Sequence, residues 1–140
     1  MALSVTGKQV ESVLRKLLPQ KGYEVQNPPR ECGETGADII ARNGEERVFI
    51  ECIGFQEHPP TRSKQFYEAF FRAISRLKDG ANRCVMALPA RFKRGMNARA
   101  RQYGKAWKRI GDAFPELQFW FVEVEKNRYE MSKWNDWGNF

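Results

Sequence analysis

Apolar side chains recur at helical spacing in three parts of the chain. In the first part, a stripe from Val10 to Leu18 follows a capping box formed by Thr6 and Gln9. We expect this helix to end at Pro19, because proline is unfavourable inside a helix. Two further stripes predict one helix over about residues 62–78 and one over about residues 95–113.

Five shorter apolar segments have the length and composition of β-strands. They cover residues 23–25, 37–42, 46–53, 84–88 and 118–124. Asn43 and Gly44 separate the second segment from the third and predict a tight hairpin turn. The element order α-β-β-β-α-β-α-β therefore predicts an α/β protein with one mixed sheet flanked by helices.

The chain is 140 residues long, which suits one domain with a substantial core. We expect residues 1–140 to form this domain and residues 126–140 to be a short aromatic tail. The tail contains Trp134, Trp137 and Phe140, and we expect the two tryptophans to pack back onto the sheet.

Two acidic residues lie within the predicted hairpin, where apolar side chains are expected. Along a strand the side chains alternate between the two faces, so Phe49, Glu51 and Ile53 share one face. A turn at residues 43 and 44 would place Asp38 opposite about residue 49 and diagonally next to Glu51. Two such carboxylates repel each other unless a cation lies between them, and hard oxygen ligands favour Mg²⁺ or Mn²⁺.

Around these acids the chain resembles the PD-(D/E)XK nuclease superfamily, which has a restriction-endonuclease-like core. Gly36-Ala37-Asp38 resembles the aspartate motif, Ile50-Glu51-Cys52-Ile53 resembles the second motif, and the similarity covers roughly residues 6–89. The resemblance implies that Asp38, Glu51 and the Cys52 carbonyl bind the metal ion that activates water. It further implies that Glu11, in the first helix, assists.

One residue departs from this resemblance. The superfamily has a lysine where this chain has Ile53. Some members supply that charge from the following helix, where Lys64 is the first candidate for this role and Arg62 is the second. Gln65 matches a glutamine that some members carry in the same helix, but the tyrosine expected four residues later is Ala69. A structural alternative is that Glu51 pairs with a buried arginine such as Arg42.

Positive charge dominates the chain and is concentrated in one segment. The net charge is +7 and the pI is about 9.5. No acidic residue lies between Asp79 and Asp112, and such a one-sign surface attracts phosphates. The candidate nucleic-acid contacts are Arg91, Lys93, Arg94, Arg99, Arg101, Lys105, Lys108 and Arg109. We expect four of them (Arg101, Lys105, Lys108 and Arg109) to lie opposite the stripe that contains Trp107. The alternative is an ordinary solvated helix face.

The remaining composition favours a cytoplasmic protein. The three cysteines have no CxxC spacing, so neither a disulfide framework nor a zinc site is expected. No apolar run approaches the roughly 20 residues of a membrane span, and the first residues lack the pattern of a secretion signal.

Together with the resemblance, which implies catalytic roles for Asp38, Glu51, Lys64 and Glu11, these patterns predict a Mg²⁺-dependent DNA endonuclease. Two alternatives remain open at this point. One is a catalytically inactive nucleic-acid-binding module with the same fold, and the other is a basic subunit that binds an acidic protein. A homodimer is compatible with the first prediction, because cutting both strands of a duplex commonly takes two sites.

Overall fold

The computed structural model describes residues 4–29 and 36–138, so Cys32 and Phe140 lie outside the described residues. The α-helices are α1 (Gly7–Gln20), α2 (Pro59–Ser75), α3 (Lys93–Tyr103) and α4 (Lys105–Ala113). The strands are β1 (Glu24–Val25), β2 (Ile39–Asn43), β3 (Glu46–Cys52), β4 (Arg83–Pro89), β5 (Leu117–Glu123) and β6 (Arg128–Lys133). Four 3-10 turns complete the chain: η1 (Arg76–Asp79), η2 (Ala90–Phe92), η3 (Val124–Lys126) and η4 (Trp134–Asp136).

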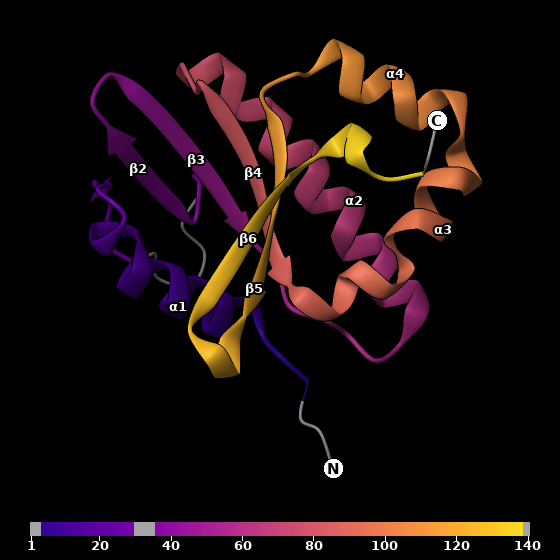
Figure 1. Cartoon of the computed structure of the whole chain (residues 1–140), viewed down its shortest axis with the longest axis horizontal. Helices are drawn as coiled ribbons and strands as arrows, with labels where there is room; N and C mark the ends of the chain where they lie inside the picture. The colour runs from indigo at the N-terminus through magenta and orange to yellow at the C-terminus, as the bar shows by residue number, and fades with distance from the viewer. Residues whose placement is uncertain (1–3, 30–35, 139–140) are drawn as a thin grey trace.

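The six strands form one mixed sheet in the order β1-β2-β3-β4-β5-β6 (Figure 1). Strands β1, β2 and β3 are antiparallel, β3, β4 and β5 are parallel, and β6 returns antiparallel to β5. The predicted α/β class and the element order are therefore confirmed, with two additions described below.

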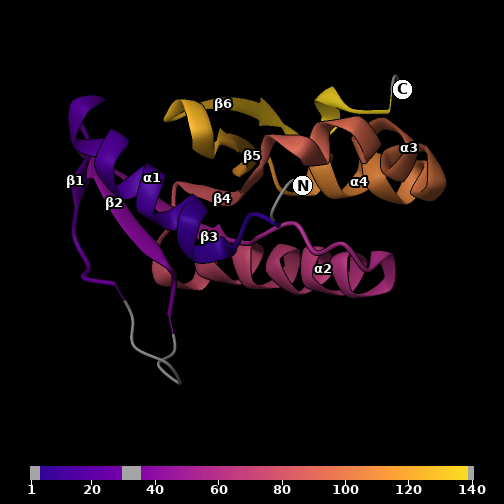
Figure 2. The same cartoon turned by 90° about the horizontal axis from the view of Figure 1, so that it is seen from below.

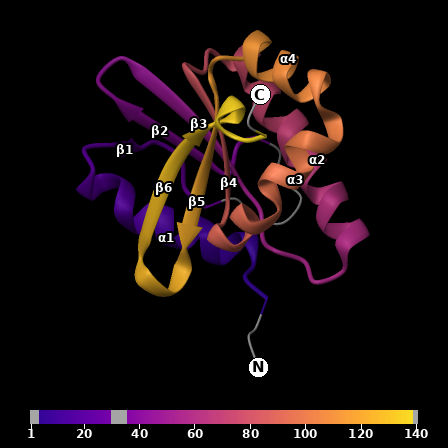
Figure 3. The same ribbon diagram turned by 45° about the vertical axis from the view of Figure 1, so that its right-hand side comes forward.

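Helices cover both faces of the sheet. Helix α1 packs its apolar stripe against Ile39, Val48 and Ile50 on one face. Helices α2, α3 and α4 cover the other face, where Phe49 and Phe119 lie in a second cluster. Figures 1 and 3 show α1 on one side of the strands and the other three helices on the opposite side. Side chains of consecutive β3 residues therefore enter different layers, as the alternation predicts.

The first helix begins as its sequence predicts. The Thr6 hydroxyl accepts a hydrogen bond from the Gln9 N–H at 3.2 Å, and the Gln9 side chain accepts one from the Thr6 N–H at 2.9 Å. This reciprocal pair satisfies two backbone donors that a helix start otherwise leaves unpaired. The helix continues past Pro19 to Gln20, so the predicted end was wrong by about one residue.

The β2–β3 hairpin turns one residue later than predicted. Asn43 pairs with Glu46, so the two loop residues are Gly44 and Glu45. Gly44 has a φ of 64°, in the left-handed region that a primed turn requires and glycine adopts without strain. This one-residue change shifts the register of the whole hairpin.

The predicted helix over residues 95–113 is two helices. Gly104 separates α3 from α4 and has φ 51° and ψ −116°, a conformation that continues neither helix. The prediction of a single helix was wrong because the apolar spacing continues from Met96 and Ala100 to Trp107, although the helix axis changes at the glycine. Figure 2 shows α3 and α4 together at the end of the molecule opposite the β1–β2 hairpin.

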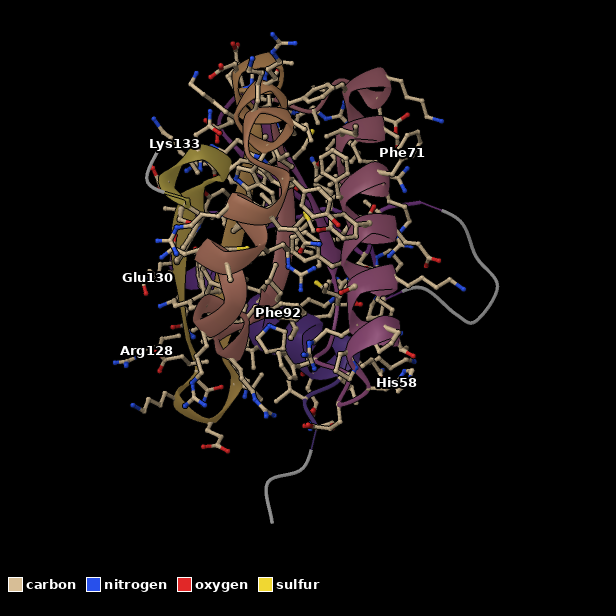
Figure 4. The ribbon with its side chains drawn as sticks, turned by 90° about the vertical axis from the view of Figure 1, so that its right-hand side faces the viewer. His58, Phe71, Phe92, Arg128, Glu130 and Lys133 are labelled. Atoms are coloured by element: carbon tan, nitrogen blue, oxygen red, sulfur yellow. The ribbon has the colours of Figure 1, made fainter. Side chains whose placement is uncertain are left out.

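Most of the predicted C-terminal tail is ordered structure. Residues 128–133 form β6, and Figure 4 shows Arg128, Glu130 and Lys133 along its outer edge. Trp134 then packs into the core, and its indole N–H donates to the Trp107 carbonyl at 2.8 Å. The Trp107 indole N–H donates to the Trp134 carbonyl at 3.0 Å, which fastens the chain end to α4. The expected packing of the tryptophan against the sheet is confirmed.

Within the described ranges, no helix is both long and apolar enough to cross a lipid bilayer.

Candidate active site

Asp38 and Glu51 are brought together at the open end of the β2–β3 hairpin. Ile39 pairs with Ile50, and the same register continued by one residue places Asp38, just before β2, opposite Glu51. The predicted diagonal relation was wrong because it assumed a turn one residue earlier. Directly opposite residues in an antiparallel pair share a face and are closer than diagonal ones. The Asp38 carboxylate also accepts a hydrogen bond from the Cys52 N–H at 2.8 Å, which fixes it against the end of β3.

Glu51 is a fully buried acid. Its Oε1 pairs with Arg76 Nε at 3.0 Å, and its Oε2 lies 3.9 Å from Arg72 Nε. Burial, followed by the negative charge of Asp38, raises the pKa of the Glu51 carboxyl, while the two arginines act in the opposite direction. The alternative of a buried arginine partner is thus correct in kind, but the partner is not Arg42, which is exposed and donates to the Gly44 carbonyl at 2.6 Å.

Glu51 Oε2 is buried and has no hydrogen-bond partner. A buried carboxylate oxygen in this state is costly unless it binds a donor or a cation. Arg72 is too distant for a hydrogen bond, and Asp38 adds a second negative charge nearby. The oxygen is therefore in the electrostatic condition that a bound cation would relieve.

Glu11 reaches this region from α1 and is held by an arginine. Arg15 Nε lies 2.8 Å from Glu11 Oε2. The same guanidinium donates to the carbonyls of Asp38 at 2.8 Å and Asn27 at 2.7 Å. Arg15 thus ties α1 to the segment before β2 and fixes the backbone of Asp38. Glu11 and Arg15 also border a pocket of about 240 Å³ together with Lys8, Ser12 and Pro29.

Cys52 lies among the three acids. Burial, and then the charges of Asp38, Glu11 and Glu51 in that order, raise the pKa of the Cys52 thiol well above its ordinary value. The thiol is therefore uncharged at neutral pH. The Cys52 carbonyl lies beside the start of α1, where a Cβ added to Gly7 would come within 3.0 Å of the carbonyl oxygen. The glycine allows this close approach of α1 to β3.

A second pocket, of about 300 Å³, opens next to Cys52. Its border combines the start of α1, the end of β3 and the inner side of α2. The lining residues are Thr6, Gly7, Cys52, Ile53, Gly54, Gln56, Gln65, Glu68 and Arg72. Gln65 and Arg72 therefore face the pocket, and we call this space the β3 pocket.

Lys64 is not among the residues that line the β3 pocket. Its side chain is 76% exposed and lies 4.0 Å from Glu68. Arg72 is eight positions after Lys64 in α2, which corresponds to a rotation of about 80° around the helix axis. Ile53 is buried in the core under α2, so no charge comes from that position either. The cation nearest to Glu51 on the pocket side is Arg72.

Sequence reasoning missed the arginines that hold the acids. Arg72 and Arg76 are four residues apart and flank the buried Ala73, so they project from adjacent turns towards the sheet. In the sequence, arginines next to a small apolar residue of the helix stripe could have indicated that these side chains are directed towards the sheet. Arg15, four residues after Glu11, carried the same kind of signal in α1.

The donor set near Asp38 suits a hard divalent cation. Two carboxylates and one backbone carbonyl are available, and Mg²⁺ usually binds one or two carboxylates and completes its shell with water and substrate oxygens. Within residues 4–29 and 36–138, no three or more His, Cys, Asp or Glu side chains form a group that could hold a metal by themselves. The residues thus fit an ion that shares its coordination with a phosphate.

The basic segment, residues 91–109, is less uniform than its sequence suggests. Three of the eight candidates are paired with acids, two of them with acids from distant parts of the chain and one with an acid of the same helix. The ion pairs are Arg91–Glu57 at 2.8 Å, Lys93–Glu130, and Lys108–Asp112 at 2.7 Å. The prediction of a one-sign surface was therefore wrong for these positions. Glu57 and Glu130 come from a loop and a strand that pack near the segment, and Asp112 lies one turn after Lys108 in α4.

The other candidates in the segment are arranged in two ways. Arg99 is packed between helices, with its guanidinium carbon 4.5 Å from the centre of the Phe66 ring. In the part of the chain that the structure describes, the four remaining cations are exposed and have no ion pair. They are Arg94, Arg101, Lys105 and Arg109. Because Gly104 breaks the helix, Arg101 belongs to α3, and Lys105 and Arg109 belong to α4.

Comparisons with known proteins agree with this architecture. The sequence model of a family described as restriction endonuclease, of the Mrr catalytic type, matches residues 2–110. No curated protein matches the sequence. Among solved structures, an XisH family protein from Nostoc punctiforme has a similar fold, with a TM-score of 0.56 and 16% sequence identity. That match covers 87% of this chain and 96% of the other.

Proposed function

Because this chain belongs to the restriction endonuclease family, we propose that it is a Mg²⁺-dependent endonuclease that hydrolyses phosphodiester bonds in DNA. The matched region contains the first helix, the hairpin with both acids, and α2. It therefore includes every residue that borders the β3 pocket.

The observation that carries the proposal is the state of Glu51. A carboxylate without solvent contact has one oxygen lacking a hydrogen bond and faces a second acid across the hairpin. Such an arrangement destabilises the folded state as long as the charge is not neutralised. A bound cation would neutralise it, and cation binding is the function that this chemistry supports. Strain of this kind is concentrated at functional sites.

Each nearby group has a distinct role in the proposal. Asp38, Glu51 and the Cys52 carbonyl hold the ion, and Glu11 assists from α1. When bound, the ion polarises the phosphate and makes water a stronger nucleophile. Arg72 lies beside the pocket and stabilises negative charge that develops on the phosphate, a role for which the sequence alone predicts Lys64.

Nicking of supercoiled plasmid tests this activity most simply. The wild type is expected to convert the plasmid to open circles with Mg²⁺ or Mn²⁺ and not with EDTA. Asp38→Asn is the informative variant, since its amide oxygen can still accept from the Cys52 N–H while the charge is lost. Glu45→Gln, a change at the exposed hairpin loop, is the matched control. Equal nicking by wild type and Asp38→Asn would refute the proposal.

One observation favours a second function, that of a catalytically inactive DNA-binding module. Arg76 already pairs with Glu51 at 3.0 Å, and Ile53 stands where the superfamily has lysine. A buried acid neutralised by arginine needs no ion for its own stability. DNA binding without any metal-dependent nicking by the wild type would select this function over the first.

A further inference from the structure

Two arginines lie against one aromatic ring beside the β3 pocket. The guanidinium carbon of Arg62, in α2, is 4.3 Å from the centre of the Phe55 ring, and that of Arg91, in η2, is 4.4 Å away. Phe92 packs edge-on against the same ring, with the two centroids 4.9 Å apart. We call Arg62, Phe55 and Arg91 the Phe55 clamp. Figure 4 shows Phe92 near the start of α2, which His58 marks.

Hydrogen bonds hold both guanidiniums but use few of their donors. Arg62 Nη1 donates to the Gln56 carbonyl at 2.7 Å and, more weakly, to that of Glu57 at 3.5 Å. Arg91 Nη1 donates to the Glu57 carboxylate at 2.8 Å. Among the described residues, the other N–H groups of both side chains have no hydrogen-bond partner. The arginines are thus oriented in advance while most of their donors remain available.

The charges of the clamp are unbalanced. The two cations lie within about 9 Å of each other, the most that their distances to one ring allow. The Glu57 carboxylate pairs with Arg91, and its side chain is 58% exposed, whereas Arg62 contacts only the backbone carbonyl of Glu57. A single exposed carboxylate leaves a local excess of positive charge, which an incoming anion would neutralise.

The position of the clamp connects it to the candidate active site. Gly54 and Gln56, the residues on either side of Phe55, both line the β3 pocket. Phe55 itself follows Cys52 by only three residues and is fixed by a hydrogen bond from its N–H to the Val5 carbonyl at 2.8 Å. The clamp therefore adjoins the β3 pocket through the segment Gly54–Gln56.

We propose that Arg62 and Arg91 bind the phosphodiester backbone of the DNA strand that enters the β3 pocket. The planar guanidinium fork matches phosphate oxygens in a bidentate manner, and the Phe55 ring keeps both forks in place. Glu57 occupies Arg91 in the free protein and is displaced by the strand. This inference rests on the proposed function, which supplies the phosphodiester ligand.

Salt-dependent binding of a fluorescent DNA duplex in EDTA tests the clamp without any cleavage. Log affinity falls against log salt by about 0.9 for each phosphate contact. The double variant Arg62→Ala/Arg91→Ala should therefore flatten the slope by about 1.8 and lower the affinity tenfold or more at low salt. Arg47→Ala is the matched control, because Arg47 also lies over a ring (Phe49, at 5.0 Å) but near the opposite end of β3. It should leave the slope unchanged.

A second variant keeps the test informative if the double variant folds poorly. Glu57→Gln removes the competing carboxylate and should raise the affinity several-fold. Unchanged slopes in the double variant together with unchanged affinity in Glu57→Gln would overturn the clamp. Binding through the clamp without nicking would support this inference and refute the proposed activity. Nicking with an unchanged slope would do the reverse.

Discussion

Charge is held in two different ways at the end of β3 and on α4. At β3, Glu51 is buried, and Arg76 and Arg72 face its two carboxylate oxygens. On α4, Lys105 and Arg109 are exposed, and neither has an ion pair in the described part of the chain. Both regions concentrate charge, but only the first contains a buried acid that is held by a hydrogen-bonded ion pair, the pair of Glu51 with Arg76.

The difference follows from solvation. A buried ion loses its hydration and needs partners, whereas an exposed ion keeps its water and needs none. In our proposal the β3 end holds a small cation in one place, whereas the α4 surface attracts polyanions without selecting among them. Changes in the two regions should have effects of different size and on different measurements.

The largest effect is expected from breaking the buried pair. Arg76→Met leaves Glu51 buried with only the more distant Arg72, and the loss of such a partner costs about 3 kcal/mol. Thermal unfolding should show a decrease of roughly 10 °C for a protein of this size. Adding Glu51→Gln should recover much of the loss. Arg109→Met, an exposed control, should change stability by less than about 0.5 kcal/mol. Similar losses in both arginine variants would erase the distinction between the regions.

A smaller but specific effect concerns the cation beside the pocket. Arg72→Ala should slow plasmid nicking by about two orders of magnitude, typical of removing one charge stabiliser. Lys64→Ala, at an exposed position of the same helix, should nick within about twofold of the wild type. Single-turnover rates with Mn²⁺ measure both. The opposite ranking would establish Lys64 as the replacement for the superfamily lysine and remove Arg72 from the mechanism.

The pH dependence of stability sharpens the comparison further. The folded-state pKa of Glu51 is raised above its ordinary value, so the folded protein binds this proton more tightly than the unfolded chain does. The stabilisation is fully present below the unfolded-state pKa and is lost as pH rises through the folded-state pKa. Chemical unfolding of wild type and Glu51→Gln should therefore show the wild type gaining relative stability as pH falls from 7 towards 4.5. A constant difference in the free energy of unfolding between the two proteins across this pH range would contradict a raised pKa of the buried Glu51 carboxyl.

The smallest effect is expected on the α4 surface. Lys105→Ala and Arg109→Ala should each flatten the salt dependence of duplex binding by about 0.9 if each contacts one phosphate, and should not alter melting. Lys108→Ala should flatten it less, because Asp112 already pairs with Lys108 at 2.7 Å. Slopes equal to that of the wild type in all three variants would mean that DNA does not contact this surface.

The spacing of apolar residues was sufficient to predict most of the fold, because buried positions recur with the period of the helix or strand that contains them. The alternation of β3, the stripe of α1 and the capping box at Thr6 are local patterns that determine local structure. The break at Gly104 and the late hairpin turn at Gly44 depend on single backbone conformations, which apolar spacing does not encode. Strand β6 was missed because its exposed edge has few apolar residues.

Only part of the candidate site could be predicted from the sequence in this way. Asp38 and Glu51 are close in sequence and joined by one hairpin, so their proximity could be predicted. Arg76 is 25 residues away from Glu51 and reaches it only after α2 packs on the sheet. The acids that neutralise Arg91 and Lys93 come from similarly distant segments. Partners of this kind depend on tertiary packing, which a single sequence does not reveal.

Metal-dependent thermal stability tests the shared cation site most directly. A ligand that binds only the folded state raises the melting temperature, and an ion at 100 times its dissociation constant contributes about 2.7 kcal/mol. Millimolar Mn²⁺ should therefore raise the melting temperature of the wild type and of the Glu45→Gln control by several degrees. It should leave Asp38→Asn unchanged. An equal Mn²⁺ response in wild type and Asp38→Asn would contradict a site shared by Asp38 and Glu51.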